Sequence, residues 1–141
     1  MSKERAWTRQ SLMAGAAVIL VLVTGLVHLV ETPANYAEAA YKGILFFLNA
    51  VGAAVAAYGI YRHKTWGWGL GLFVTGGALI FYVVNRTVGL PGLEVDPQWF
   101  EPIGILSVIV ESVFIILGVV YLARYRKSVP RDGSQQRPLT P

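Results

Sequence analysis

The chain has 141 residues, of which 55% are hydrophobic and 14% are charged. Soluble domains typically carry about 25% charged residues, so the composition argues against an ordinary water-soluble fold. Cysteine is absent, which excludes disulfides, thiolate metal sites and cysteine nucleophiles. The net charge is +4, but the basic residues stand in short segments between apolar blocks, so their distribution does not predict a nucleic-acid partner.

The apolar residues form four blocks, at positions 12–30, 36–61, 66–88 and 103–123. A helix of about 20 residues, rising 1.5 Å per residue, crosses the roughly 30 Å hydrocarbon core of a bilayer. We therefore predict an all-α transmembrane four-helix bundle over residues 1–127, embedded in the lipid bilayer of the plasma membrane. Residues 128–141 contain Pro, Gly, Ser, Gln and Arg without an apolar period, which predicts a disordered cytoplasmic tail.

Basic and acidic connections alternate along the chain. Ten of the twelve Lys and Arg residues lie in the N-terminal segment, in the connection after the second block and in the C-terminal segment. The other two connections carry mainly Glu and Asp. Because the cytoplasmic loops of membrane proteins hold the excess of Lys and Arg, we predict that both termini are cytoplasmic and that the acidic connections face outward.

Local signals predict where the helices begin and end. Thr32 and Pro33 predict the end of the first helix, because proline has no backbone N–H with which to continue the helix. Asn35 and Glu38 have the spacing of a capping box, so Asn35 is predicted to cap the second helix. Four aromatic residues near block ends predict a belt at the membrane interfaces: Trp66, Trp68, Trp99 and Tyr125.

Small residues mark helix faces that can approach a neighbour closely. Gly67 and Gly71 form a GxxxG pair in the third block, and Gly52, Ala56 and Gly59 follow one face of the second. In lipid, helices associate through close packing of such faces. These residues predict tight contacts inside the bundle, in a homo-oligomer or with a larger membrane complex.

Polar residues gather in the half of the bundle that is predicted to face outward. Counted from the outer ends of their blocks, Asn49 and Glu111 both lie roughly 11–14 Å deep. Each block contributes at least one polar group to this half: His28, Glu31, Lys42, Asn49, Tyr82, Arg86, Ser107 and Glu111. We predict a cavity that opens outward, with Glu111 at its deepest point.

Two roles are open for Glu111. An acid in the middle of a membrane helix costs about 2.5–3.5 kcal/mol on insertion scales, so it should face protein or water. It is either a group that binds a proton or a cation, or a structural acid that bonds to Asn49 or pairs with Arg86. The spacing of Ser107 and Glu111 places both on one helix face.

His28 has several possible roles as well. It could join Glu31 and Glu111 in a metal site if the helices bring all three together. A b-type haem held by His28 would need a second copy of the chain for a second imidazole. The simpler alternative is a histidine at the membrane boundary that bonds to a carbonyl or to Glu31. The cofactor is therefore left unknown.

The sequence also resembles a group of small, uncharacterised bacterial four-span membrane proteins. The resemblance lies in the stretch from His28 to Asn49, in Trp99-Phe100-Glu101-Pro102 with Ser107 and Glu111, and in Asn85-Arg86-Thr87-Val88-Gly89-Leu90-Pro91-Gly92. It implies four spans and a polar site in the outer half, and it brings no substrate or cofactor with it.

Two functions follow as hypotheses. The first is a small integral membrane protein whose outward cavity binds a proton, a cation or a small polar ligand at Glu111. The second is a non-catalytic accessory subunit that docks on a larger membrane complex through its glycine faces. The chain has no phosphate-binding loop, no HExxH motif and no recognisable Ser/His/Asp set, so an enzyme is the less favoured interpretation.

Overall fold

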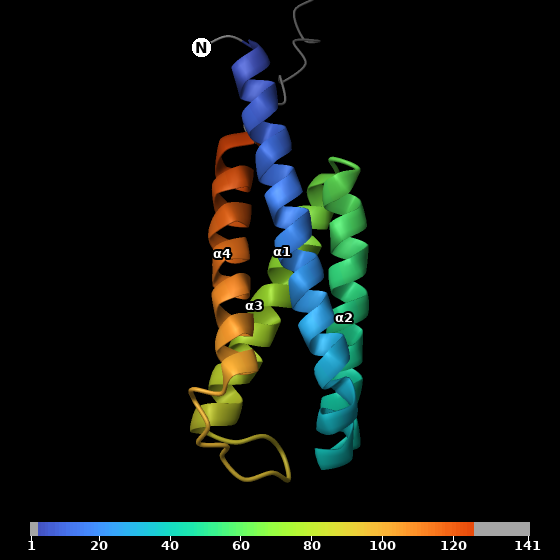
Figure 1. Ribbon diagram of the computed structural model, residues 1–141, viewed down its shortest axis with the longest axis vertical. Helices are drawn as coiled ribbons and strands as arrows, with labels where there is room; N and C mark the ends of the chain where they lie inside the picture. The colour runs from blue at the N-terminus through green and yellow to red at the C-terminus, as the bar shows by residue number, and fades with distance from the viewer. Residues whose placement is uncertain (1–2, 126–141) are drawn as a thin grey trace, which may run out of the picture.

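The computed structural model describes residues 3–125, which fold into four helices. They are α1 (Lys3–Glu38), α2 (Ala40–Tyr61), α3 (Thr65–Thr87) and α4 (Pro102–Tyr125), shown in Figure 1. Each of these helices is long and apolar enough to cross a membrane. The prediction of an all-α four-helix bundle is confirmed, and the chain is a multi-pass membrane protein. The tail predicted at 128–141 lies outside the described residues.

The four helices run up and down in chain order. The start of α1, the α2–α3 turn and the end of α4 lie at one end of the bundle, and the other two connections lie at the opposite end (Figure 1). Helix α1 packs against α2 and α4, and α3 packs against the same two helices, whereas α2 and α4 lie diagonally opposite. A space bounded by all four helices can therefore form along the bundle axis.

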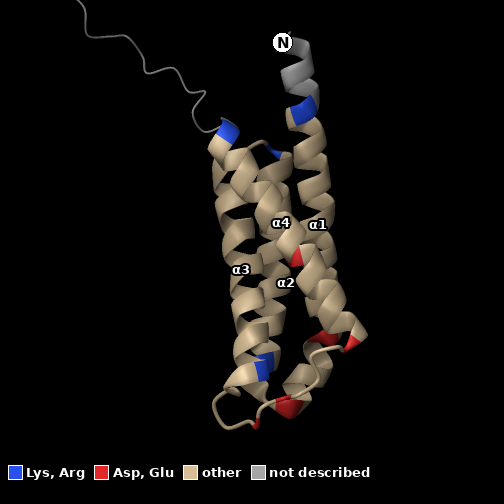
Figure 2. Cartoon of the chain, turned by 90° about the vertical axis from the view of Figure 1, so that its left-hand side faces the viewer, with Lys and Arg blue, Asp and Glu red and all other residues tan. Residues whose placement is uncertain are grey.

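Charge is segregated along the bundle axis. Lys and Arg mark the end that holds the α2–α3 turn, and most of the Asp and Glu lie at the opposite end (Figure 2). Two basic residues belong to the acidic end, because Lys42 lies in the first turn of α2 and Arg86 in the last turn of α3. We call the two halves of the molecule the basic half and the acidic half.

The first helix does not end where the sequence predicted. It continues through Pro33 to Glu38, so Asn35 lies inside α1 and does not cap α2. Membrane helices tolerate proline where side chains bond to nearby backbone groups. On either side of Pro33 the Thr32 hydroxyl donates to the carbonyl of His28 at 2.7 Å, and the Asn35 amide donates to the carbonyl of Glu31 at 2.8 Å. Neither bond reaches the carbonyl of Leu29, to which the missing N–H of residue 33 would have donated.

The chain reverses at a single extended residue, Ala39, with φ −155° and ψ 128°. So short a connection forces the end of α1 against the start of α2. Gly43 makes this possible, because a Cβ atom there would collide with the backbone and Cβ of Tyr36. The α1–α2 junction therefore depends on a missing side chain and not on the predicted capping box.

The basic half is filled by an apolar core. Trp68 is fully buried and stacks on Tyr121, with ring centroids 3.9 Å apart. The prediction that Trp68 belongs to an interfacial belt is wrong, because its helix turns the ring toward α4. Gly67 brings α3 against α2, since a Cβ atom there would lie 2.5 Å from the backbone of Gly59 and Ile60. Because these side chains fill the basic half, the remaining space between the helices lies in the acidic half.

Candidate binding cavity

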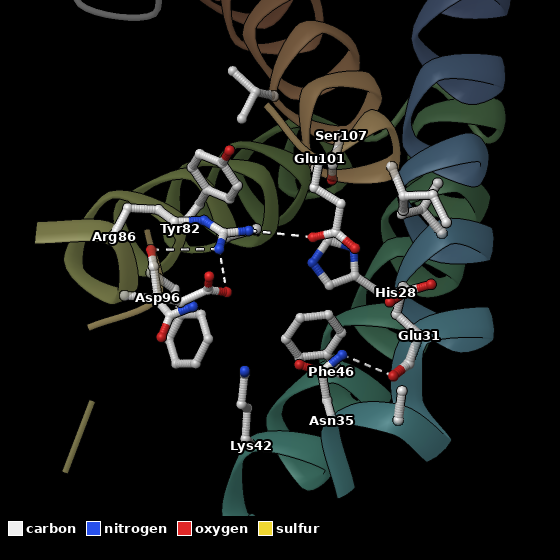
Figure 3. A pocket seen from close by; sticks show the side chains of 18 of the residues that line it. His28, Glu31, Asn35, Lys42, Phe46, Tyr82, Arg86, Asp96, Glu101 and Ser107 are labelled. Atoms are coloured by element: carbon white, nitrogen blue, oxygen red, sulfur yellow. Dashed lines mark hydrogen bonds and ion pairs between the residues drawn. The ribbon is translucent and has the colours of Figure 1, made fainter. Parts of the chain in front are cut away.

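A cavity of about 260 Å³ lies in the acidic half. All four helices and the α3–α4 connection contribute to its wall (Figure 3). Seven of the eight polar residues predicted from the sequence line it: His28, Glu31, Lys42, Tyr82, Arg86, Ser107 and Glu111. The polar residues of separate spans therefore share one chamber.

Glu111 is the most deeply buried acid of the cavity, with 1% of its surface exposed. It lies about nine residues, or roughly 14 Å, along α4 from Pro102. The hydroxyl of Ser107, one turn earlier, donates to its Oε1 atom at 2.8 Å. The same oxygen lies 3.9 Å from Nε2 of His28 on α1. The acid is thus held by its own helix and faces the neighbouring one.

The hydrogen bonding of His28 defines which ring nitrogen carries a proton. Its Nδ1 atom lies 2.9 Å from the backbone carbonyl of Thr24. A carbonyl oxygen only accepts, so Nδ1 must donate an N–H to it. In a neutral imidazole the other nitrogen then carries a lone pair. The lone pair on Nε2 faces the carboxyl group of Glu111.

Two acceptors that face each other inside a protein need a donor between them. A neutral His28 and an ionised Glu111 both present lone pairs across the 3.9 Å gap. A proton on either group, or a cation placed between them, changes this contact from repulsive to attractive. Because unpaired buried polar groups are costly, the pair provides a site for one positive charge.

Arg86 closes one side of the cavity near the mouth. It is buried, with 6% of its surface exposed, and its guanidinium lies 5.0 Å over the ring of Tyr82. It forms ion pairs with Asp96 and, at 3.3 Å, with Glu101, both in the segment between α3 and α4 (Figure 3). Arg86 therefore does not form the pair with Glu111 that the sequence left open as one alternative.

The α3–α4 connection is tied to two helices. The hydroxyl of Tyr82 donates to the carbonyl of Trp99 at 2.7 Å, and the hydroxyl of Tyr41 donates to that of Pro91 at 2.8 Å. The backbone N–H of Asp96 donates to the carbonyl of Asn85 at 3.2 Å. These bonds hold the acids of the connection against Arg86 and make the connection part of the rim.

Lys42 lies on the opposite side of the cavity. Lys42 is buried, with 5% of its surface exposed, and its side chain points into the cavity (Figure 3). Its ammonium group pairs with Glu38 at the end of α1. Glu31 also lines the cavity, and within the described residues no cation pairs with it. Both cations of the cavity are therefore neutralised locally, whereas Glu31 and Glu111 keep no permanent counter-charge.

Asn49 is the predicted site residue that the structure places elsewhere. Its amide donates to the carbonyl of Val74 at 3.1 Å, so it does not bond to Glu111. It lines a second cavity beside the first. Among the side chains that the structure describes, no group of three His, Asp or Glu is arranged to hold a metal ion. Glu31 thus does not complete a metal site with His28 and Glu111.

Sequence reasoning missed three contributors to this site. Thr24 orients His28, a role that the four-residue spacing of the two along one helix could have suggested. Asp96 and Glu101 hold Arg86. The sequence carries no comparable signal for these acids, because their position depends on the path of an irregular connection.

The fold and the cavity define a multi-pass membrane protein with a buried acid–imidazole pair. Comparison of the chain with protein-family models, with curated proteins and with solved structures finds no match. The cavity is therefore the feature from which a function can be inferred.

Proposed function

We propose that this protein binds a proton or a small cation between His28 and Glu111, in a cavity that opens outward from the plasma membrane. The observation that carries the proposal is the pair of opposed acceptors, 3.9 Å apart, where the residue Glu111 has only 1% of its surface exposed. A buried ionisable group in a membrane helix is a functional candidate by default.

The charge of the cavity supports a cation over an anion. Among the described lining residues, five carboxylates face two permanently basic side chains. Both basic side chains already pair with acids of the same cavity. A cleft with an excess of one sign concentrates ligands of the opposite sign. Cations are therefore drawn inward, and free anions are repelled.

The direction of opening follows from the distribution of charge. The cavity lies in the acidic half, and the excess of Lys and Arg lies in the connections of the basic half. The positive-inside rule places the basic half in the cytoplasm. A ligand then reaches Glu111 from the outer face of the membrane, and both termini lie inside the cell.

Binding fits the geometry better than catalysis does. The hydroxyl of Ser107 donates to Glu111 and not to His28, so the serine–imidazole contact that activates a serine nucleophile is not formed here. Ser107 instead stabilises the carboxylate, as expected for a group that exchanges a proton for a cation.

Proton release on cation binding tests the proposal. Methylammonium is added to the purified protein in weakly buffered detergent solution, and a pH-indicator dye reports released protons. The wild type should release protons in proportion to its concentration, because the cation replaces the proton at the pair. Glu111→Gln should release none.

Glu94→Gln is the matched control, since Glu94 is an exposed acid outside the cavity. It should release as many protons as the wild type. Equal release from the wild type and Glu111→Gln would show that the pair is not the binding site.

A second candidate function is that of an accessory subunit in a homo-oligomer or a larger membrane complex. Gly15 on α1 and Gly76 on α3 favour it, because a Cβ atom at either would meet nothing within 4 Å. Such open small-residue positions suit docking of another helix. Light scattering coupled to size-exclusion chromatography in mild detergent tests this, and a stable monomer with the full proton release described above would exclude dependence on a partner.

A further inference from the structure

The second cavity is an apolar groove of about 340 Å³ on the side of the bundle. It lies between α1, α2 and α3, and three large apolar side chains of its lining are exposed on the bundle surface: Leu45, Leu48 and Phe73. Phe73 is 77% exposed. In a membrane-spanning bundle such surfaces meet lipid. The groove therefore opens sideways, toward the hydrocarbon of the bilayer.

The groove adjoins the polar cavity. The two share four lining residues: His28, Phe46, Ala78 and Phe81. The rings of Phe46 and Phe81 meet edge to face with centroids 6.2 Å apart, and the imidazole of His28 lies 5.0 Å from the ring of Phe46. Aromatic rings thus form the partition between the acid-rich chamber and the lipid-facing groove.

The groove also holds a polar atom without a partner. The Oδ1 atom of Asn49 is buried, and none of the described residues donates to it. Gly77 opens the adjacent wall, because a Cβ atom there would meet nothing within 4 Å. The groove therefore has room for an apolar ligand chain, and its wall carries one hydrogen-bond acceptor, the Oδ1 atom of Asn49.

We propose, building on the cation site proposed above, that the ligand is an amphiphilic amine. Its ammonium group lies between Nε2 of His28 and the carboxylate of Glu111, and its apolar chain passes the partition into the lateral groove. An ammonium supplies both the positive charge and the N–H donors that the opposed acceptors need. The aromatic partition suits the boundary between its charge and its chain, since ring faces attract cations.

A series of amines tests the inference. Methylamine, butylamine and octylamine are titrated calorimetrically into the wild-type protein in nanodiscs, with empty nanodiscs as the blank for partitioning. Affinity should rise with chain length, by up to about fourfold for each methylene that leaves water for the groove. Octanol has the chain without the charge and should bind at least tenfold more weakly than octylamine.

Two matched glycine variants test whether the alkyl chain of the amine lies in the groove. Gly77→Leu fills the groove, whereas Gly69→Leu makes the same change on the same helix at an open position outside the groove. In Gly77→Leu the affinity should no longer rise with the length of the alkyl chain, whereas the affinity for methylamine should be unchanged. Gly69→Leu should behave as the wild type. The amine series on the wild type needs no variant, so it decides the question even if Gly77→Leu fails to fold.

The outcomes separate the groove from the cation site. Equal affinity of the wild type for methylamine and octylamine would show that the alkyl chain does not bind in the groove. The same conclusion would follow if affinity rose with alkyl-chain length in Gly77→Leu as much as in the wild type. Either result would leave the cation site intact. Octylamine binding that survives Glu111→Gln, or tight binding of octanol, would show that the groove holds an uncharged lipid chain instead. Failure of the cation site itself would appear as equal proton release from Glu111→Gln and the wild type.

Discussion

His28 and Glu111 face each other across the α1–α4 interface, with Nε2 and Oε1 3.9 Å apart. Because Nδ1 of the imidazole is committed to the carbonyl of Thr24, the facing nitrogen has no proton of its own when the ring is neutral. The contact is favourable only when a positive charge or a donor occupies it. This condition leads to the first prediction.

Glu111→Gln should change the free energy of unfolding by less than about 1 kcal/mol. The amide retains an acceptor for Ser107 and adds N–H donors that can face His28, so it mimics the carboxyl group with its proton in place. Glu111→Leu removes the acceptor for Ser107 and leaves His28 unpaired, which should cost about 1–3 kcal/mol. Thermal melts in one detergent compare the two, and equal destabilisation would show that the negative charge itself supports the fold.

Arg86 and Glu111 should act independently. The guanidinium pairs with Asp96 and Glu101 and with no other described acid. Removal of one partner of a fully buried pair costs about 3–5 kcal/mol, but these two acids are partly exposed, so Arg86→Gln should cost about 1–3 kcal/mol. The double variant with Glu111→Gln should be additive within about 0.5 kcal/mol in a mutant cycle. Strong coupling would instead place the two charges in one network.

Gly67 should tolerate no side chain. A Cβ atom at this position would lie 2.5 Å from the backbone of Gly59 and Ile60, which cannot move as a flexible side chain does. We expect Gly67→Leu to destabilise the bundle by about 3 kcal/mol or more. Gly69→Leu, two residues along the same helix, meets open space and should melt with the wild type. Equal melting temperatures for the two variants would contradict the close backbone contact between α3 and α2 at Gly67.

The orientation in the membrane can be measured by labelling single cysteines. The native chain has no cysteine, so each introduced thiol reports alone. Cysteine at position 95, in the α3–α4 connection, should react with an impermeant reagent added outside the cell, and cysteine at position 63, in the α2–α3 turn, should react only after the membrane is opened. The reverse pattern would place the cavity on the cytoplasmic side.

The number and kind of elements could be predicted from the sequence because they depend on local properties. A block of apolar residues long enough to cross a bilayer has few alternatives to a helix, since every backbone group in lipid must bond within its own segment. Seven of the eight polar residues predicted for one chamber line it. Their depth along each helix follows from counting residues at 1.5 Å each, and antiparallel connections bring equal depths together.

Only the tertiary structure decided what each of these side chains meets. Asn49 and Glu111 lie at similar depth, yet the rotation of α2 directs the amide to Val74 and away from the acid. The same kind of rotation turns Trp68 into the core and away from the membrane interface. Arg86 finds its partners in a connection whose path has no repeating pattern to predict it. Depth along a helix is a property of the chain, whereas direction around a helix is set by packing against neighbours that the sequence alone does not place.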